Sequence, residues 1–409
     1  MNEMKKFKIS QGAKNAILIG SLCSISYLAV YVARNVLGAI SPQMTDGGYF
    51  TIEQIGTLSG VYFACYAIGQ LINGFIGDKI KAKYMIGLGL ALAGVANVLF
   101  PAVSPAPLAA YAVYGISGFF LSMIYGPMTK LVAENTEPVY ATRCSLGYTF
   151  ASFIGSPAAG VLASFMPWQN VFLITSILLL IMGAVVLVSF SVLERRGLIE
   201  FGKYRSKSSA LSVSGAKTLI KHQIIKFILI ALITGVIRTA VISLFTLYLS
   251  EHLGYSSENA ARIFTVATFI ISFTAFIAIF VYERLRRNME LTILISFSLA
   301  AVLFTCVYFV RSPIVNIVLL VIAIMASNSA ATMMYSRYCP SLYETGMVST
   351  ATGFLDFVSY MSAAAASTLF SSIVGRIGWS NLVLIWTALM VAGVIVALPY
   401  RRTKKASKQ

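Results

Sequence analysis

The sequence has 409 residues, of which 58% are hydrophobic and only 11% are charged, and its formal net charge is +17. A typical soluble domain is roughly 25% charged. A chain with a mean hydropathy of +0.82 therefore has too few polar side chains to cover a surface in water. Because a helix of about 20 apolar residues crosses a bilayer, this composition excludes a soluble protein and predicts an all-α membrane protein.

Twelve apolar segments are predicted to cross the membrane as helices. The first six lie at residues 14–40, 53–77, 84–101, 106–133, 140–164 and 168–193. A polar segment follows at 194–221, which we interpret as a cytoplasmic linker. The last six lie at residues 222–250, 257–282, 290–310, 313–339, 345–374 and 379–399. The expected domains are therefore two six-helix bundles, at residues 1–193 and 222–409, joined by the linker.

The basic residues indicate which way the chain crosses the membrane. All but five of the 31 Lys and Arg residues fall on the side of the N-terminus, and the exceptions are Arg34, Arg238, Arg262, Arg311 and Arg376. Cytoplasmic loops carry such an excess of positive charge. We expect a multi-pass protein of the cell membrane with both termini in the cytoplasm. The charge is then a topology signal, with some contact to anionic lipid, and not a sign of nucleic-acid binding.

No catalytic or metal-binding pattern is visible. The five cysteines are scattered through the predicted helices without metal-ligand spacing. No set of a nucleophile with a neighbouring base appears in the sequence. We expect no metal, no cofactor and no enzymatic activity.

Charged features recur at a constant offset in the two halves of the chain. An arginine lies in the first span of each half, a glutamate opens the second span, and an acid followed by a base ends it. The pairs are Arg34 and Arg238, Glu53 and Glu258, and Asp78-Lys79 and Glu283-Arg284, at offsets of 204, 205 and 205 residues. Internal repeats of six spans build the two halves of one large class of transporters.

The acid–base pairs Asp78-Lys79 and Glu283-Arg284 admit two interpretations. An acid beside basic residues can pair across neighbouring helix ends and hold one conformation closed, which predicts gating loops. The same charges can instead serve only to orient the helices in the membrane.

These motifs resemble a known family. The loop from Gly74 to Lys83, with its second copy, is similar to that of the major facilitator superfamily. The stretches Tyr31–Pro42 and Ile237–Glu251 resemble spans one and seven of the organophosphate:phosphate antiporters. The resemblance implies the major facilitator fold, antiport by alternating access, and a phosphate group bound by the arginines at 34 and 238.

Three positions depart from the pattern of that family. It has a lysine directly after the arginine of span one, a lysine in span two and a histidine in span five, whereas this chain has Asn35, Gln70 and Ser152. The site is less positive than in the family, so a less highly charged anion is an alternative to a phosphate ester.

The charges inside the predicted spans are the candidate functional residues. An arginine at mid-span costs at least about 2.5–3.5 kcal/mol, and Arg34 and Arg238 occupy matching positions. Each could reach an interface or pair with an acid. Alternatively both bind one substrate, because guanidinium groups bind carboxylate and phosphate oxygens bidentately. Tyr27 and Tyr31 share a helix face with Arg34 and are further candidates for substrate binding.

Asp356 in span eleven has no acidic counterpart in the first half. Its carboxylate could neutralise Arg238 in the empty site, take up protons for coupling, or bond to a serine or tyrosine of a neighbouring helix. These three alternatives remain open at the level of sequence.

The expected function is secondary active transport of an organic anion, with a phosphorylated metabolite such as a sugar phosphate or glycerol phosphate as the foremost candidate. We expect a monomer whose partners are this anion and membrane lipid. Two alternatives remain: a transporter-like membrane sensor of sugar phosphate, and a proton-coupled exporter of drugs or metabolites. The paired arginines argue against the exporter.

Overall fold

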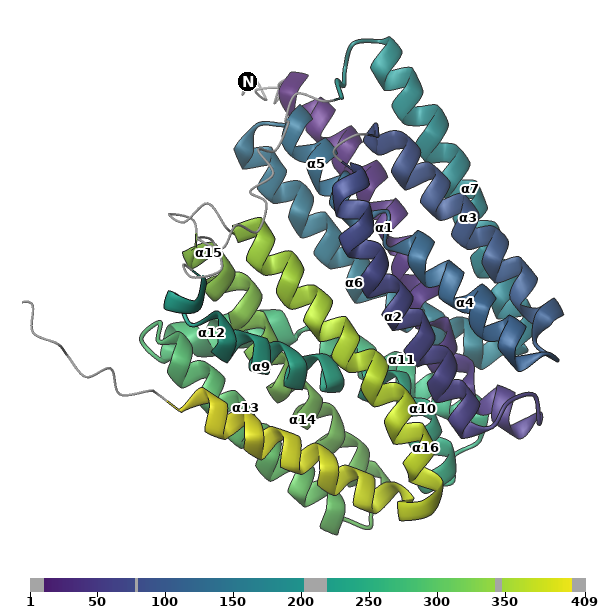
Figure 1. Ribbon diagram of the computed structural model, residues 1–409, viewed down its shortest axis with the longest axis vertical. Helices are drawn as coiled ribbons and strands as arrows, with labels where there is room; N and C mark the ends of the chain where they lie inside the picture. The colour runs from purple at the N-terminus through teal and green to yellow at the C-terminus, as the bar shows by residue number, and fades with distance from the viewer. Residues whose placement is uncertain (1–10, 78–79, 202–218, 343–347, 399–409) are drawn as a thin grey trace, which may run out of the picture. The chain divides into compact units, whose positions relative to one another are not determined.

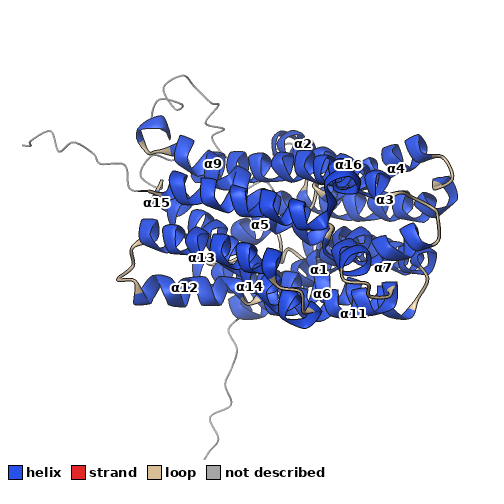
Figure 2. Ribbon diagram, turned by 90° about the horizontal axis from the view of Figure 1, so that it is seen from below, coloured by secondary structure: helices blue, strands red, loops and turns tan. Residues whose placement is uncertain are grey.

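The computed structural model describes residues 11–77, 80–201, 219–342 and 348–398. Every regular element in these ranges is a helix (Figure 2). Ten helical runs in the described residues are long and apolar enough to cross a membrane. A further helix, α6, spans 28 residues, and a kink divides the last run, of 50 residues, into two helices. The all-α membrane fold is confirmed, and these helices are consistent with the twelve predicted spans.

The contacts divide the chain into two units, of which the first falls within residues 1–210, 239–272 and 360–376. In it, α1 packs along α6, α3 along α7, and α2 along α4, while α11 packs on α6 and α1 (Figure 1). Its helices are α1 (Gln11–Asp46), α2 (Ile52–Gly77), α3 (Ala82–Val103), α4 (Pro107–Leu121), α5 (Tyr125–Asn135), α6 (Pro138–Phe165), α7 (Trp168–Arg195), α10 (Phe245–Leu247), η2 (Tyr248–His252) and α11 (Ser257–Ser272).

The second unit falls within residues 211–238, 273–359 and 377–409. In it, α14 packs against α13, α12 and α9. Its helices are α9 (Ile224–Gly235), α12 (Thr274–Arg284), α13 (Met289–Phe309), α14 (Pro313–Met333), η3 (Met334–Tyr338) and α15 (Cys339–Ser341). The π-helix η1 (Val236–Val241) and the long run α16 (Val348–Ala397) each contribute residues to both units.

Local sequence signals account for several helix starts. Thr51 and Gln54 form a reciprocal capping box at the start of α2, in which the backbone N–H of each donates to the side chain of the other. The side chain of Asn288 accepts a bond from the N–H of Leu291 and so caps α13. Proline occupies the first position of α4, α6 and α14, where no helical N–H partner is lost.

Glycine sets how closely two of the helices approach, and where another one ends. A Cβ on Gly183 of α7 would lie 2.9 Å from the carbonyl oxygen of Gly87 on α3, so small residues are needed at this crossing. Gly378 has φ 79° and ψ 160° inside α16. Such a backbone is open to glycine at little cost, so Gly378 separates residues 348–377 from 379–397.

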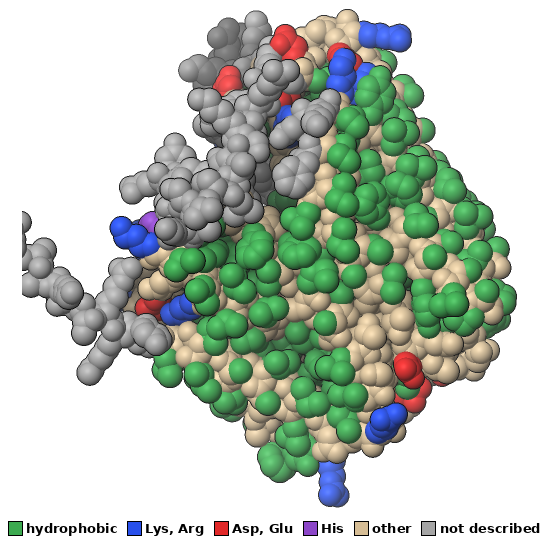
Figure 3. Space-filling model, in the orientation of Figure 1, with side chains coloured by type: hydrophobic (Ala, Val, Ile, Leu, Met, Phe, Trp, Pro, Cys, Tyr) green, Lys and Arg blue, Asp and Glu red, His purple; other side chains and the backbone are tan. Residues whose placement is uncertain are grey.

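The surface agrees with a membrane environment. Hydrophobic side chains cover most of the face in Figure 3, and the few charged side chains lie near helix ends. Exposed large apolar residues occur along most of the helices, with Leu108, Phe165 and Phe309 each more than 70% exposed. Exposed apolar surface on this scale is costly in water and suited to lipid.

Candidate anion-binding residues

Arg34 lies in the first unit, inside an aromatic cage formed by Tyr31, Phe63, Tyr66 and Tyr360. Its guanidinium carbon lies 5.8, 5.7, 5.3 and 4.6 Å from the centroids of these four rings, respectively. An arginine within about 6 Å of an aromatic face gains roughly 0.5–2 kcal/mol, the larger value where water is excluded. The aromatic cage therefore replaces part of the hydration that the cation loses within a membrane helix.

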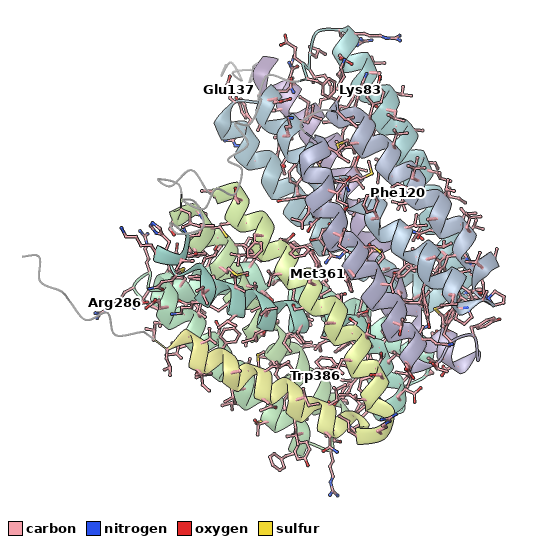
Figure 4. The ribbon with its side chains drawn as sticks, in the orientation of Figure 1. Lys83, Phe120, Glu137, Arg286, Met361 and Trp386 are labelled. Atoms are coloured by element: carbon pink, nitrogen blue, oxygen red, sulfur yellow. The ribbon has the colours of Figure 1, made fainter. Side chains whose placement is uncertain are left out.

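The rings of this cage also support one another. Tyr66 and Tyr360 meet edge to face with centroids 5.0 Å apart, and Phe63 stacks on Tyr360 at 6.2 Å. Tyr360 comes from α16, beside Met361, which Figure 4 labels. Three helices, α1, α2 and α16, thus hold one guanidinium group in place.

The aromatic cage leaves the charge of Arg34 without an acidic partner. No carboxylate in the described ranges lies within 4.0 Å of its nitrogens. Nor does any oxygen in those ranges accept a hydrogen bond from its guanidinium group. Stacking uses the face of a guanidinium and leaves its in-plane N–H donors available. Arg34 can therefore offer a fork of donors to an anion.

Tyr27 and Tyr31, the other candidates on α1, lie in different surroundings. Tyr31 is half-buried and belongs to the aromatic cage. Tyr27 is only 9% exposed and packs against Tyr31, Tyr125 and Tyr148 at centroid distances of 5.0, 5.3 and 6.3 Å. Tyr27 supports the position of Tyr31, while Tyr31 is the one beside Arg34.

Arg238 lies in the second unit and has an acid close by. Its Nη2 atom is 3.6 Å from Oδ1 of Asp356 and 3.5 Å from the hydroxyl of Ser359, to which it donates. The Tyr335 hydroxyl donates to the same Oδ1 atom at 3.2 Å, and the Tyr335 ring lies 5.5 Å from the guanidinium. Asp356 thus bonds to a tyrosine while it faces an arginine. Two of the alternatives that the sequence leaves open for Asp356, a contact with Arg238 and a bond to a tyrosine, therefore occur together.

Two members of this group sit on π-helical turns. Arg238 lies in η1 and Tyr335 in η3. A π-turn adds one residue to a helical turn and so redirects the side chains that follow it, and such turns are frequent at functional sites. Here the turns bring side chains from two helices onto one carboxylate of α16.

The predicted gating loops are described only in part. Asp78 and Lys79 lie outside the described residues. Glu283 and Arg284 are exposed at the end of α12, where the guanidinium of Arg284 lies 5.3 Å from the Phe280 ring. A gating role for these four residues stays a prediction.

In the first unit, two lysines at the start of α3 pair with one glutamate at the end of α7. Lys83 (Figure 4) lies 2.6 Å from one carboxylate oxygen of Glu194, and Lys81 lies 2.7 Å from the other. The bond to Glu194 raises the pKa of Lys81 above its usual value of 10.5.

Sequence patterns do not single out three rings of the aromatic cage. Phe63, Tyr66 and Tyr360 are ordinary aromatic residues of apolar helices when they are considered singly. One signal was available, since Tyr360 follows Asp356 by four residues and so shares its helix face.

Of the residues at which this chain departs from the antiporter pattern, Asn35 donates to the carbonyl oxygen of Tyr31 in the preceding turn.

Comparison with known proteins places this fold in a family. The model of the Major Facilitator Superfamily matches residues 23–367. The chain belongs to this superfamily. It is 20% identical to the glycerol-3-phosphate transporter of Bacillus subtilis, over 93% of this chain and 91% of that protein. It is also 30% identical to the membrane sensor protein UhpC of Salmonella typhimurium over 76 residues, which is 19% of this chain and 17% of the sensor.

Solved structures show the same fold. The nucleoside transporter NupG, determined as a mutant, matches with a TM-score of 0.74 at 16% identity, over 93% of this chain and 98% of that one. A bacterial homolog of the human lysosomal transporter Spinster, inward-facing and occupied, matches with a TM-score of 0.69 at 14% identity, over 93% and 94% of the two chains. The expected superfamily is confirmed, together with its likeness to the glycerol-phosphate and hexose-phosphate transporters.

Proposed function

We propose that this protein is a secondary active transporter. It moves an organic anion across the cell membrane by alternating access. The observation that carries the proposal is Arg34, a cation within a membrane helix that is held by four aromatic rings and has no carboxylate partner among the described residues. A structural arginine within a membrane span usually pairs with an acid or with backbone carbonyl groups. An arginine that binds a substrate anion needs neither.

The internal repeat supports a second binding residue. Arg238 occupies in the second half of the chain the position that Arg34 occupies in the first. We propose that both bind the transported anion, and that the anion displaces Asp356 from Arg238. Binding can draw the halves of a transporter together only if the closed state holds the anion better than the open state does.

The names of the relatives suggest which anions to examine first. They include a glycerol-3-phosphate transporter and hexose phosphate transport proteins. Sugar phosphates and glycerol phosphate are accordingly the leading candidates, and the corresponding sugar acids are their carboxylate analogues. We propose that both termini lie in the cytoplasm, in keeping with the distribution of basic residues.

A two-stage experiment tests this function. A thermal-shift screen of phosphorylated and carboxylated metabolites on the purified protein identifies anions that bind. Uptake of these anions into proteoliposomes then shows whether binding leads to transport. We expect uptake by the wild type and its loss in Arg238→Ala, with Arg262→Ala as the control, since Arg262 is exposed and pairs with Glu258 within one helix turn.

Two outcomes contradict the proposal. A protein that binds none of these anions is not an organic-anion transporter. A protein that binds a sugar phosphate but moves none across the bilayer is a sensor, as the local similarity to a membrane sensor protein suggests.

A further inference from the structure

A groove of about 400 Å³ lies between α1 and α6, and both helices belong to the first unit. The two helices run in the same direction, because Gly12 faces Tyr140 near their starts and Gly155 faces Tyr31 further along. On α1 the groove extends over residues 13–25. With a rise of about 1.5 Å per residue, this stretch is about 18 Å long.

Small side chains explain why the groove is present. A Cβ on Gly20 would lie 2.6 Å from Sγ of Cys144, and a Cβ on Gly147 would meet the hydroxyl group of Ser24. The thiol of Cys144 also donates to the carbonyl oxygen of Ala16 at 3.5 Å. Helices in membranes approach closely where small residues meet. The same small side chains leave a hollow along the flank of the contact.

The groove is bordered by exposed apolar side chains. Ile17 and Ile25 of α1 line it and are 58% and 51% exposed. Ile154 of α6 is 53% exposed and shares a helix face with Gly147, which also lines the groove. A hydrocarbon chain is the natural occupant of such a surface within a membrane span.

The length of the groove fits one leaflet of a bilayer. The hydrocarbon core is about 30 Å thick, so each leaflet supplies roughly 15 Å of it. The groove is about 18 Å long and begins near the start of α1. One acyl chain of the leaflet on the side of the N-terminus can therefore lie along the whole groove.

Two cations lie at the end of the groove nearer the N-terminus. Arg143 lines the groove and is exposed, with its guanidinium carbon 5.8 Å from the centroid of the Tyr140 ring. Lys14 is also exposed, and it precedes Ile17 by three residues on the same helix face. Within the described ranges neither cation has a carboxylate within 4.0 Å. The acid nearest to Arg143 in the sequence, Glu137, precedes the start of α6 (Figure 4).

From this arrangement we infer that the groove binds one anionic phospholipid, with an acyl chain between α1 and α6 and its phosphate group on Arg143 and Lys14. A phosphate group accepts the paired N–H donors of a guanidinium, and basic residues at the membrane surface attract anionic lipid. The two cations alone would only orient the chain in the membrane, but the groove beside them adds a place for the acyl chain. This site goes beyond the proposed function and does not depend on which anion is transported.

Native mass spectrometry of the purified full-length protein tests this site. The probes are phosphatidylglycerol and phosphatidylcholine with the same acyl chains, so that both have a phosphate group but only phosphatidylglycerol has a net negative charge. We expect the wild type to bind phosphatidylglycerol about tenfold more tightly than phosphatidylcholine, because the two cations favour the negative lipid.

Three variants separate the contributions of the headgroup and the acyl chain. Arg143→Gln should reduce the preference for phosphatidylglycerol to less than about threefold. Ser21→Trp should weaken the binding of both lipids, because Ser21 lines the groove on the exposed side of α1 and an indole there would fill it. Arg262→Gln removes an exposed positive charge from α11 and is the control, which should bind both lipids as the wild type does.

Three results would overturn the inference. Equal affinity of the wild type for the two lipids would remove the role of the cations, as would a preference in Arg143→Gln as large as that in Arg262→Gln. Unchanged lipid binding by Ser21→Trp would place the lipid outside the groove. A dimer of the wild type that dissociates in Ser21→Trp would show that a second copy of the chain occupies the groove instead of a lipid. If Arg143→Gln does not fold, the wild type and Ser21→Trp still decide.

Discussion

The Nη2 atom of Arg238 lies 3.6 Å from Oδ1 of Asp356, and this pair joins a π-helical turn of η1 to the long run α16. Arg34, which occupies the equivalent position in the sequence repeat, is surrounded by aromatic rings instead. The two arginines thus share a position in the repeat but not an electrostatic environment.

The Arg238–Asp356 pair should show energetic coupling. Removing either partner leaves the other as a half-buried charge, so Arg238→Ala and Asp356→Ala should each lower the free energy of unfolding by about 1–3 kcal/mol. The double variant should lose less than the sum, with a coupling energy of about 0.5–3 kcal/mol. Denaturation of the purified proteins in detergent, followed as a double-mutant cycle, measures this value.

A second pair in the same chain serves as the control for that cycle. Arg262 and Glu258 lie four residues apart and are both 55% exposed. Surface pairs of this kind contribute about 0.3–0.5 kcal/mol. Equal coupling in the two cycles would show that Arg238 and Asp356 do not form a desolvated pair.

A contact inside the first unit can be used to trap one conformation. The hydroxyl groups of Ser59 on α2 and Ser243 lie 2.8 Å apart, and both side chains are buried. Cysteines at both positions should form a disulfide on oxidation, and uptake should fall to below about a tenth, because alternating access requires packed elements to separate. A reducing agent should restore it.

The matched controls for this crosslink are the two single variants, Ser59→Cys and Ser243→Cys. They should transport normally in the presence of the oxidant, although the chain has five cysteines of its own. Full uptake by the crosslinked double variant would mean that this contact persists throughout the transport cycle.

The two lysines that share Glu194 should differ in their effect on stability. The side chain of Lys83 is 7% exposed and that of Lys81 is 52% exposed. Lys83→Met removes a shielded cation and a bond to Ser191, and should lower the free energy of unfolding by about 1–3 kcal/mol. Lys81→Met should stay near the wild type, because water screens an exposed pair. Equal losses would contradict this account.

The comparison of Lys81→Met with Lys83→Met can be made at neutral pH, because Lys81 keeps its charge there. The hydrogen bond to Glu194 raises the pKa of Lys81. A raised pKa gives a stabilisation that is complete below the unfolded value and is lost only as the pH rises through the folded value. Lys81 therefore stays charged in both states at neutral pH, where the unfolding midpoints are compared.

Much of the fold could be predicted because the membrane imposes simple rules. Long apolar runs and the distribution of basic residues predict the helices, and α6 and the kink at Gly378 fit the spans expected there. The repeat also marks Arg34 and Arg238 as candidate site residues from the sequence alone, because charged residues are rare within membrane spans.

The surroundings of those arginines could not be predicted in the same way. The aromatic cage brings Phe63, Tyr66 and Tyr360 together from helices that are far apart in the sequence, and aromatic residues are too common in this chain to mark a site. The π-turns that hold Arg238 and Tyr335 depend on local backbone geometry, which hydrophobic periodicity does not reveal.

In the proposed mechanism Arg34 binds the transported anion. This role is tested most directly by the initial rate of uptake into proteoliposomes for the wild type, Arg34→Gln, Arg34→Lys and the control Arg262→Gln. Loss of the charge-assisted hydrogen bonds of the guanidinium should reduce the rate of Arg34→Gln about 100-fold, with an intermediate loss in Arg34→Lys, which keeps the charge but not the fork of donors. Arg262→Gln should transport as the wild type does. Uptake by Arg34→Gln at the wild-type rate, with equal amounts of folded protein in the vesicles, would contradict the claim.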